Sequence, residues 1–411
     1  MIKVIRNLSL IFLVLLILGF LLIVVTYSLP VDNPHEHVVE DAGQFTKLKP
    51  MVIPNYNSTK LDLYTDSKIL SELSYYNKNV SLINNAMSSY GSVGTDFHKY
   101  IDGDESVMVE YARYWHGNLV VYKPLFEFLD YNAIKILQLF FELIMIIAIT
   151  KLMLESNLKK FIVPFLLSIF LIHPEVIGLC LQYATMFNIM LISVYILLKF
   201  KDYLFVKNRL IYYFFIIGIA TSYFDLLTYP LISFGIPIIF YILLSEDKTD
   251  VKNMILKIIL FGLIWSLGFI GMWLAKLIIS SIILQKNIVE NALNQFIFRT
   301  STDNFSRLDA LFDNLLIYKK RSYLIIAALI GIYYIKKLIN FRENISLSKL
   351  KECIPLILIS LIPFIWFIIV SNHSHIHYYF TYRELIIFFF AFLCILEYLI
   401  WDKIKFIGSK K

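Results

Sequence analysis

The sequence predicts an all-α polytopic membrane protein with about ten transmembrane helices and a large first extracytoplasmic loop. Three observations predict this fold class. Of the 411 residues, 58% are hydrophobic and only 17% are charged; long apolar stretches recur along the chain; and lysines concentrate in alternate connecting segments. A helix needs about 20 apolar residues to cross the hydrocarbon core of a bilayer. Because lipid offers no partners to backbone groups, a helical bundle satisfies them internally.

The first predicted span covers residues 8–29 and follows Lys3 and Arg6. Its apolar region is longer than that of a signal peptide and has no small-residue cleavage site, so we expect a retained helix with its N-terminus in the cytoplasm. The other predicted spans are 133–152, 161–181, 184–198, 210–223, 229–244, 256–284, 322–339, 354–371 and 384–401.

The distribution of charge predicts which segments face the cytoplasm. Lysine and arginine accumulate in short cytoplasmic loops, and the lysine-rich segments here are "ESNLKK", "KFKDYLFVKNR", "SEDKTDVKNMILK", "KKLINFRENISLSKLKE" and the tail "DKIKFIGSKK". Residues 30–132 contain 14 acidic residues against 8 Lys and Arg, which places them outside. The predicted organisation is therefore a cytoplasmic N-terminus and first helix (1–29), an extracytoplasmic loop with interfacial helices (30–132), and a bundle (133–411) with a second outer loop (285–321) and a cytoplasmic tail.

Composition also excludes several classes of function. The net charge of +7 comes from the cytoplasmic rim and does not indicate nucleic acid binding. The chain has no Walker loop and no G-x-G-x-x-G, so a nucleotide-driven pump or a nucleotide-sugar enzyme is not supported. The three cysteines fall in or beside apolar segments and are interpreted as core residues. The frequent Lys, Ile and Asn suggest an AT-rich genome and a Gram-positive bacterium. The apolar spans predict a location in its cell membrane.

Candidate carboxylates lie in "STKLDLYTDSKILSELSYYN" of the outer segment. Asp62 and Asp66 precede a stretch that we interpret as an amphipathic helix lying on the membrane surface. Their carboxylates are suited to act as a general base or to bind a hard divalent cation. The alternative is a solvated acidic loop.

Three further segments with polar residues adjoin the predicted spans. In "VEYARYWHGNLVVYKPLFEF", Arg113 and His116 lie among aromatic residues, which favours an anionic headgroup or a sugar; the alternative is an interfacial aromatic belt. Glu175, in "LIHPEVIG", lies near the outer boundary, where an acid needs a partner or a cavity. Asp225 either caps the sixth helix or orients an arginine or a substrate hydroxyl.

The segment "NHSHIHYYFTYR" precedes the last span. His373, His375 and His377 would share one face if the segment were extended, but a zinc site would lack thiol or glutamate partners, and we predict no metal centre. Arg383 is suited to bind phosphate in a planar bidentate arrangement, helped by His373 or His377. The alternative is a snorkelling anchor. The second outer loop, with Arg299, Arg307 and Asp303, either covers a lipid-facing cavity or is solvated.

These positions come from separate parts of the chain, yet the predicted topology places all of them at the outer face. One extracytoplasmic cavity at the membrane boundary explains this convergence. The residues predicted to share it are Asp66, Arg113, His116, Glu175, Asp225, His373, His377 and Arg383.

At these residues the chain resembles bacterial polytopic membrane proteins of the GT-C glycosyltransferase class. The resembling pieces are "LDLYTDSKIL", "YARYWHGNLVVYKPL", "GIATSYFDLLTYPL" and "NHSHIHYYFTYR". The resemblance implies a catalytic acid in the first outer loop and a polyprenyl-phosphate-linked sugar as donor. It puts Asp66 in the catalytic position, with Asp62 as an alternative, and Arg383 on the donor phosphate. The GT-C pattern places the acid closer to the first span, where Glu40 and Asp41 lie, so Asp41 stays open as a third choice.

The resulting hypothesis is an inverting transfer of a sugar from a polyprenyl-phosphate-linked donor to a cell-surface glycan, on the extracytoplasmic side and within membrane lipid. A divalent cation is a possible cofactor. Two alternatives remain open: a repeat-unit glycan polymerase, which product length would distinguish, and a transporter or flippase for a lipid-linked substrate, which would move its substrate without covalent change.

Overall fold

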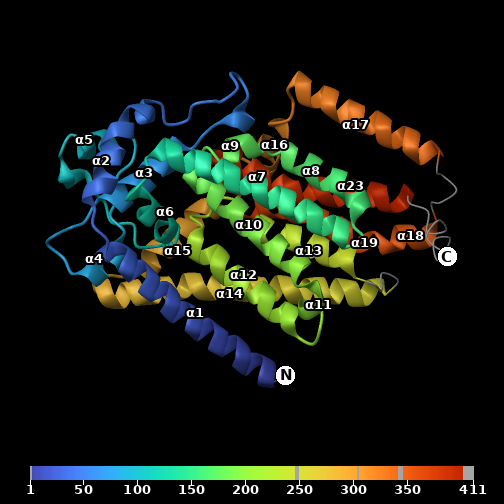
Figure 1. Ribbon diagram of the computed structural model, residues 1–411, viewed down its shortest axis with the longest axis horizontal. Coiled ribbons are helices and arrows are strands. Elements are labelled where there is room, and N and C mark those ends of the chain that lie inside the picture. Colours follow the sequence, from blue (N-terminus) through green and yellow to red (C-terminus); the bar gives the residue numbers. More distant parts are fainter. Residues whose placement is uncertain (1, 246–249, 303–304, 341–345, 401–411) are drawn as a thin grey trace.

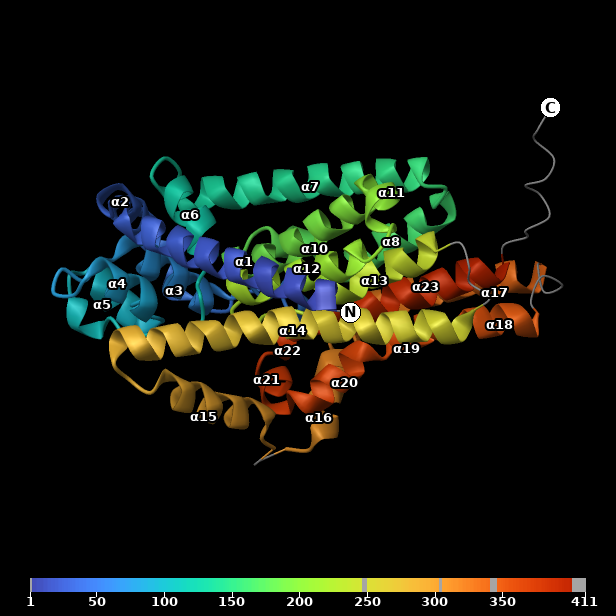
Figure 2. The same ribbon diagram turned by 90° about the horizontal axis from the view of Figure 1, so that it is seen from below.

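The computed structural model describes residues 2–245, 250–302, 305–340 and 346–400. Within these ranges every regular element is a helix, and the only β pairing is two isolated bridges, Met51 with Lys60 and Gly91 with Val109. Long helices run side by side along the molecule, and the short helices of residues 32–101 gather at one end (Figures 1 and 2).

The long and medium helices make up the bundle. They are α1 (Ile2–Ser28), α7 (Tyr131–Glu155), α8 (Ile162–Phe170), α10 (Leu181–Lys199), α12 (Arg209–Phe224), α13 (Ile232–Leu244), α14 (Val251–Leu284), α17 (Arg321–Asn340), α19 (Ile354–Ser360), α20 (Ile362–Ile369) and α23 (Ile386–Ile400). The shorter helices are α2 (Asp32–Asp41), α3 (Leu63–Ser74), α4 (Leu82–Ser88), α5 (Thr95–Ile101), α6 (Leu119–Phe126), α9 (Pro174–Ile177), α11 (Lys201–Leu204), α15 (Ile288–Thr300), α16 (Arg307–Leu316), α18 (Leu347–Glu352), α21 (Ser371–Ile376) and α22 (Tyr378–Thr381).

Six helical stretches in the described part of the chain are long and apolar enough to cross a membrane. These are α1, α7, α10, α14, α17 and the stretch Leu347–Ile369, while α12 and α13 are apolar but shorter. The protein is therefore built as an α-helical membrane protein, and multiple membrane passages are plausible. The count of ten spans stays a prediction, as does the membrane side of each loop.

The predicted spans 161–181 and 354–371 are each divided between successive helices. Residues 161–181 were expected to form one helix, but α8 ends at Phe170 and a turn leads to α9. Pro174 cannot donate a backbone hydrogen bond to a continuing helix, and His173 before it has a left-handed φ of 61°. The last predicted span continues in α23 to Ile400; its final residue and the predicted tail lie outside the described residues.

The segment between α1 and α7 folds into a compact cap of short helices. Its helix α3 is buried along nine of its residues, so the prediction of an amphipathic helix lying on the membrane surface is wrong. The reason is chemical: Ser67, Ser71 and Ser74 each donate a hydrogen bond to a carbonyl three or four residues earlier, at 2.7–2.9 Å. Because these small hydroxyls are satisfied within the helix, its polar-looking face can pack against protein.

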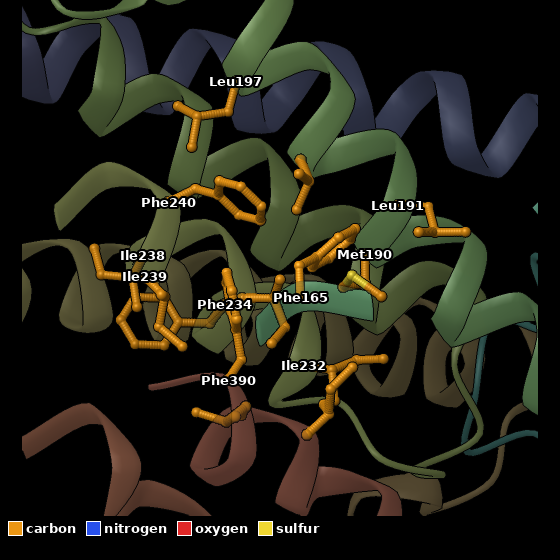
Figure 3. Packing of buried hydrophobic residues seen from close by; sticks show 14 of the residues in the cluster. Phe165, Met190, Leu191, Leu197, Ile232, Phe234, Ile238, Ile239, Phe240 and Phe390 are labelled. Carbon is orange, nitrogen blue, oxygen red and sulfur yellow. The ribbon is translucent and has the colours of Figure 1, made fainter. Parts of the chain in front are cut away.

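Two features fix the middle of the bundle. Helices α12 and α14 cross at Gly218 and Gly268, where an added Cβ would lie 2.1 Å from the Trp265 carbonyl oxygen and 2.4 Å from the Phe215 carbonyl oxygen, respectively. Small residues permit such close helix contacts in membranes. Helix α13 is buried on every side, and Figure 3 shows its aromatic and aliphatic side chains packed among those of α8, α10 and α23.

The two ends of the bundle differ in charge. The cap occupies one end, which we call the cap end (Figure 1). The turn after α7, α11 and the start of α14 lie toward the opposite end, which we call the lysine-rich end (Figures 1 and 2). The described lysine-rich connections therefore share one end, as the charge pattern predicts.

Candidate functional site

A polar cavity lies beside the cap, and an apolar groove adjoins it toward the middle of the bundle. The polar cavity, of about 400 Å³, is lined by residues of the cap and of α15, α21 and α22; its charged or imidazole-bearing residues are Lys49, Asp62, Lys68, Asp96, Glu110, Arg299, His373 and His377. The apolar groove, of about 290 Å³, is lined mostly by aromatic and aliphatic side chains of α14, α15 and α20, with Arg113, Asp225 and Arg299 as its charged residues. Arg299 lines both hollows.

Asp62 is the buried carboxylate of the polar cavity. It forms the N-cap of α3, accepting hydrogen bonds from the Thr65 backbone N–H at 3.4 Å and the Thr65 hydroxyl at 2.9 Å. Tyr379 lies beside it. Burial raises the pKa of Asp62 to about 6, because a charged carboxylate loses hydration there. A carboxyl group with that pKa exchanges a proton near neutral pH.

Asp66 has a different role. It lines neither hollow, and its oxygens accept hydrogen bonds from the Tyr131 hydroxyl at 2.6 Å and from the backbone N–H groups of Leu181 and Gln182 at 2.9 and 3.1 Å. The Cys180 thiol lies 3.3 Å away. Leu181 and Gln182 begin α10 and Tyr131 begins α7, so the Asp66 carboxylate joins three helices. Because Asp62 lines the polar cavity and Asp66 does not, Asp62 is the better candidate for the base.

Asp41, the third choice, is also engaged in packing. It accepts hydrogen bonds from the backbone N–H of Tyr131 at 2.8 Å, from the Asn132 amide at 3.2 Å and from the Gln44 amide at 2.6 Å. It does not line the polar cavity.

Arg299, in α15, contacts the histidine pair. Its guanidinium lies 2.5 Å from Nδ1 of His373. Because arginine only donates, Nδ1 must accept, and the imidazole is neutral with its proton on Nε2. Burial, with the charge of Arg299, holds the pKa of His373 well below its usual range. The arginine and the neutral imidazole therefore act as one positioned unit.

The three histidines do not share a face. The segment is helical and not extended: His373 lies in α21 and His377 is its C-cap, so these two residues, four positions apart, point the same way. Their ring centroids are 4.8 Å apart. His375 points elsewhere, with Nδ1 2.6 Å from an Asp313 carboxylate oxygen. Among residues 2–245, 250–302, 305–340 and 346–400, no group of three His, Cys, Asp or Glu side chains could hold a metal ion.

His377 and Gln182 provide neutral polar groups in the polar cavity. Burial lowers the pKa of His377 to about 3, so the ring is uncharged at neutral pH. Its Nδ1 and the Gln182 Oε1 are buried without a hydrogen-bond partner among the described residues. Buried polar groups normally have partners, so these two atoms mark a part of the polar cavity where hydrogen bonding within the protein is incomplete.

Arg383 lies behind the polar cavity and not in its lining. Its guanidinium is buried, donates to the carbonyl oxygens of Tyr379 at 3.3 Å and Ser58 at 3.4 Å, and stacks 4.3 Å from the centroid of the Tyr183 ring. It is placed to position Tyr379, which lines the cavity, rather than to meet a phosphate directly.

Arg113 and Asp225 both lie at the apolar groove. Arg113 donates to the Asn291 side chain at 2.6 Å and stacks 4.5 Å from the Tyr111 ring centroid. Asp225 accepts from the backbone N–H of Thr228 at 2.9 Å and also from the Thr228 hydroxyl. These hydrogen bonds stabilise the turn between α12 and α13. Burial raises the pKa of Asp225 to about 6.

His116 and Glu175 lie outside both hollows. His116 is buried in the cap with its Nδ1 2.9 Å from the Glu72 carboxylate, and Glu72 also pairs with Lys68 at 2.8 Å. Glu175 pairs with His173 at 2.7 Å and is half-exposed. The convergence predicted from sequence therefore brings together four of the eight positions: His373 and His377 line the polar cavity, and Arg113 and Asp225 line the adjoining groove.

Ion pairing within the protein leaves few charges for a ligand. In the polar cavity Lys68 pairs with Glu72, Asp96 with Lys99, and Glu110 with Lys286. Arg299, Lys49 and Asp62 form no ion pair with another described residue. Neither Arg299 nor Lys49 is assigned a role by the sequence patterns. The feature that could have indicated Arg299 is a cation in the second predicted outer loop. Asp303 of that loop lies outside the described residues.

Comparison of the chain with protein-family models, with curated proteins and with solved structures found no match.

Proposed function

We propose that the protein is a membrane glycosyltransferase that moves a sugar from a polyprenyl-phosphate-linked donor to a cell-surface glycan on the extracytoplasmic side. The observation that carries the proposal is the position of Arg299, at the junction of a polar cavity and an apolar groove. A lipid-linked sugar has the same order of parts: polar sugar, anionic phosphate, apolar chain.

Each part of such a donor has a matching surface. The sugar fits the polar cavity, where His377 and Gln182 offer unpartnered polar atoms. The phosphate meets Arg299, whose guanidinium suits phosphate oxygens. The first units of the chain would lie in the apolar groove beside Trp265 and Trp273. A lipid-linked donor needs no nucleotide site.

The reaction follows from the same placement. The acceptor hydroxyl oxygen attacks the anomeric carbon as the Asp62 carboxylate takes the hydroxyl proton. The bond between that carbon and the phosphate oxygen breaks, and its electron pair leaves with the polyprenyl phosphate. Arg299 stabilises the charge that develops there; removing one such donor typically slows catalysis about 10²–10³-fold. Attack from the face opposite the leaving phosphate inverts the anomeric carbon.

The test uses the purified full chain, incubated with a panel of polyprenyl-phosphate sugars and glycan acceptors. We expect transfer by the wild type, loss of transfer with Asp62→Asn and about a 10²-fold decrease with Arg299→Gln. Arg307→Gln is the matched control, because Arg307 is an exposed arginine of the same loop that donates to the Ile368 carbonyl and lines neither hollow. We also expect the rate to increase with pH through about 6, since only ionised Asp62 acts as a base.

The outcomes separate the competing functions. Products that grow by many repeat units would favour the repeat-unit polymerase. Movement of a lipid-linked substrate across proteoliposomes with no covalent change would favour the flippase. Full activity of Asp62→Asn would remove Asp62 from the mechanism.

A further inference from the structure

A second large cavity lies at the lysine-rich end of the bundle. This basic cavity has a volume of about 800 Å³ and lies among the turn after α7, α11, the end of α13 and the first turns of α14. Lys257 of its lining precedes Trp273 of the apolar groove by 16 positions on α14, which is about 24 Å of helix. The basic cavity is therefore separate from the site of the proposed transfer.

Three lysines from different elements line the basic cavity. Lys201 belongs to α11, Lys207 to the turn before α12 and Lys257 to α14, and Asp202 is the one acid among the described residues of the lining. Lys201 donates to the Ser156 hydroxyl at 3.3 Å. Lys207 and Lys257 form no ion pair with another residue of the described part of the chain. Their charges are available to an anion.

Apart from Ser156, Asn157, Asn208 and Ser245, the remaining lining is apolar and adjoins an exposed apolar surface of α14. Tyr241 and Phe261 form part of it, with their ring centroids 5.2 Å apart. Leu260 lines the cavity and is itself exposed, and Leu256 and Leu263 are exposed next to it on α14. A ligand here would have an anionic group at the lysines and hydrocarbon against α14.

We propose that the basic cavity binds an anionic glycerophospholipid, with the phosphate at Lys207 and Lys257 and an acyl chain along α14. The combination of cations with an adjoining exposed apolar surface favours a lipid over a soluble phosphate compound, which would leave that surface uncovered. Basic pockets between membrane helices commonly bind lipid head groups in this way.

The test measures bound lipid on the full chain in nanodiscs that contain equal amounts of phosphatidylglycerol and phosphatidylcholine, by mass spectrometry of the released complex. We expect phosphatidylglycerol to be retained in preference to phosphatidylcholine. Lys207→Gln with Lys257→Gln should decrease its affinity about 25-fold, since a lysine at an anionic surface contributes about fivefold. The matched control is Lys199→Gln with Lys252→Gln, which removes the same charge from exposed lysines of the same end that do not line the cavity.

For the control pair we expect the affinity for phosphatidylglycerol to decrease by no more than about twofold, because exposed charges are screened by salt. Equal losses for the two pairs would show general surface attraction and would overturn the site. Displacement of the phosphatidylglycerol by millimolar inorganic phosphate would identify a free-phosphate site and would overturn the lipid assignment. Either result leaves the proposed transfer reaction unaffected, because the two cavities are separate.

Discussion

Replacement of Asp62 by asparagine is expected to make the protein more stable at neutral pH. Burial raises the pKa of this carboxyl from its ordinary 3.8 to about 6. The difference is about 2 pKa units, and each unit corresponds to about 1.4 kcal/mol. The ionised side chain therefore destabilises the native state by about 3 kcal/mol. Asparagine removes the charge and keeps an oxygen that can accept the hydrogen bonds of Thr65.

The direction of the pH dependence follows from linkage. Because the folded pKa is higher than the unfolded one, the native state binds the proton more tightly, and stability decreases as pH increases from about 4 to about 6. Below about 4 the carboxyl is neutral in both states and contributes no penalty. The advantage of Asp62→Asn should therefore be close to zero at pH 4 and reach about 3 kcal/mol above pH 7.

Thermal unfolding of purified protein in detergent, at pH 4 and pH 7.5, measures this difference. We expect the midpoint of Asp62→Asn to exceed that of the wild type by several degrees at pH 7.5 only. Asp96→Asn is the control, since Asp96 lines the same cavity but pairs with Lys99 at 2.9 Å on the surface, and surface changes usually alter stability by less than about 0.5 kcal/mol. A variant less stable than wild type at pH 7.5, or a difference of equal size at both pH values, would refute the reasoning.

Two further predictions concern packing. Asp66→Asn should destabilise the protein by about 2–4 kcal/mol, because its NH₂ group would face hydrogen-bond donors on whichever side it lies; an unfolding midpoint equal to that of the wild type would contradict this. Gly218→Val should prevent the close contact of α12 with α14, because its Cβ would lie 2.1 Å from the Trp265 carbonyl oxygen. The yield of monodisperse protein should therefore decrease sharply. Gly331→Val is the control, because a Cβ there has no atom within 4 Å, and it should leave the yield unchanged.

The helical class and the separation of charge were predictable from sequence because both depend on local composition. Apolar stretches long enough to span a membrane are visible without knowing their neighbours, and helices overlap every predicted span. The interruption at Pro174 was also visible in the sequence. The burial of α3 was not, because its serines have the composition of an exposed face and only their hydrogen bonds to the helix carbonyls make burial possible.

The roles of individual side chains depended on partners far along the chain. Arg299 meets His373, 74 positions later, and that contact exists only because α15 packs against α21. The histidines illustrate a different difficulty: their alternation would put all three on one face of a strand, whereas in a helix the four-residue spacing of His373 and His377 decides which two converge. Local sequence did not determine which periodicity applied.

The choice between Asp62 and Asp66 depends on which hydrogen bonds their carboxylate oxygens already accept. Both carboxylates are buried on α3 four residues apart, so composition and spacing treat them alike. The oxygens of Asp66 are occupied by donors from the starts of α7 and α10, and protonating it would weaken contacts that join three helices. The Asp62 carboxylate instead accepts hydrogen bonds from Thr65, in the first turn of α3, and lies beside Tyr379 of the cavity lining. Protonating it leaves the contacts of α3 with the starts of α7 and α10 intact, which is the property that a general base at this cavity requires.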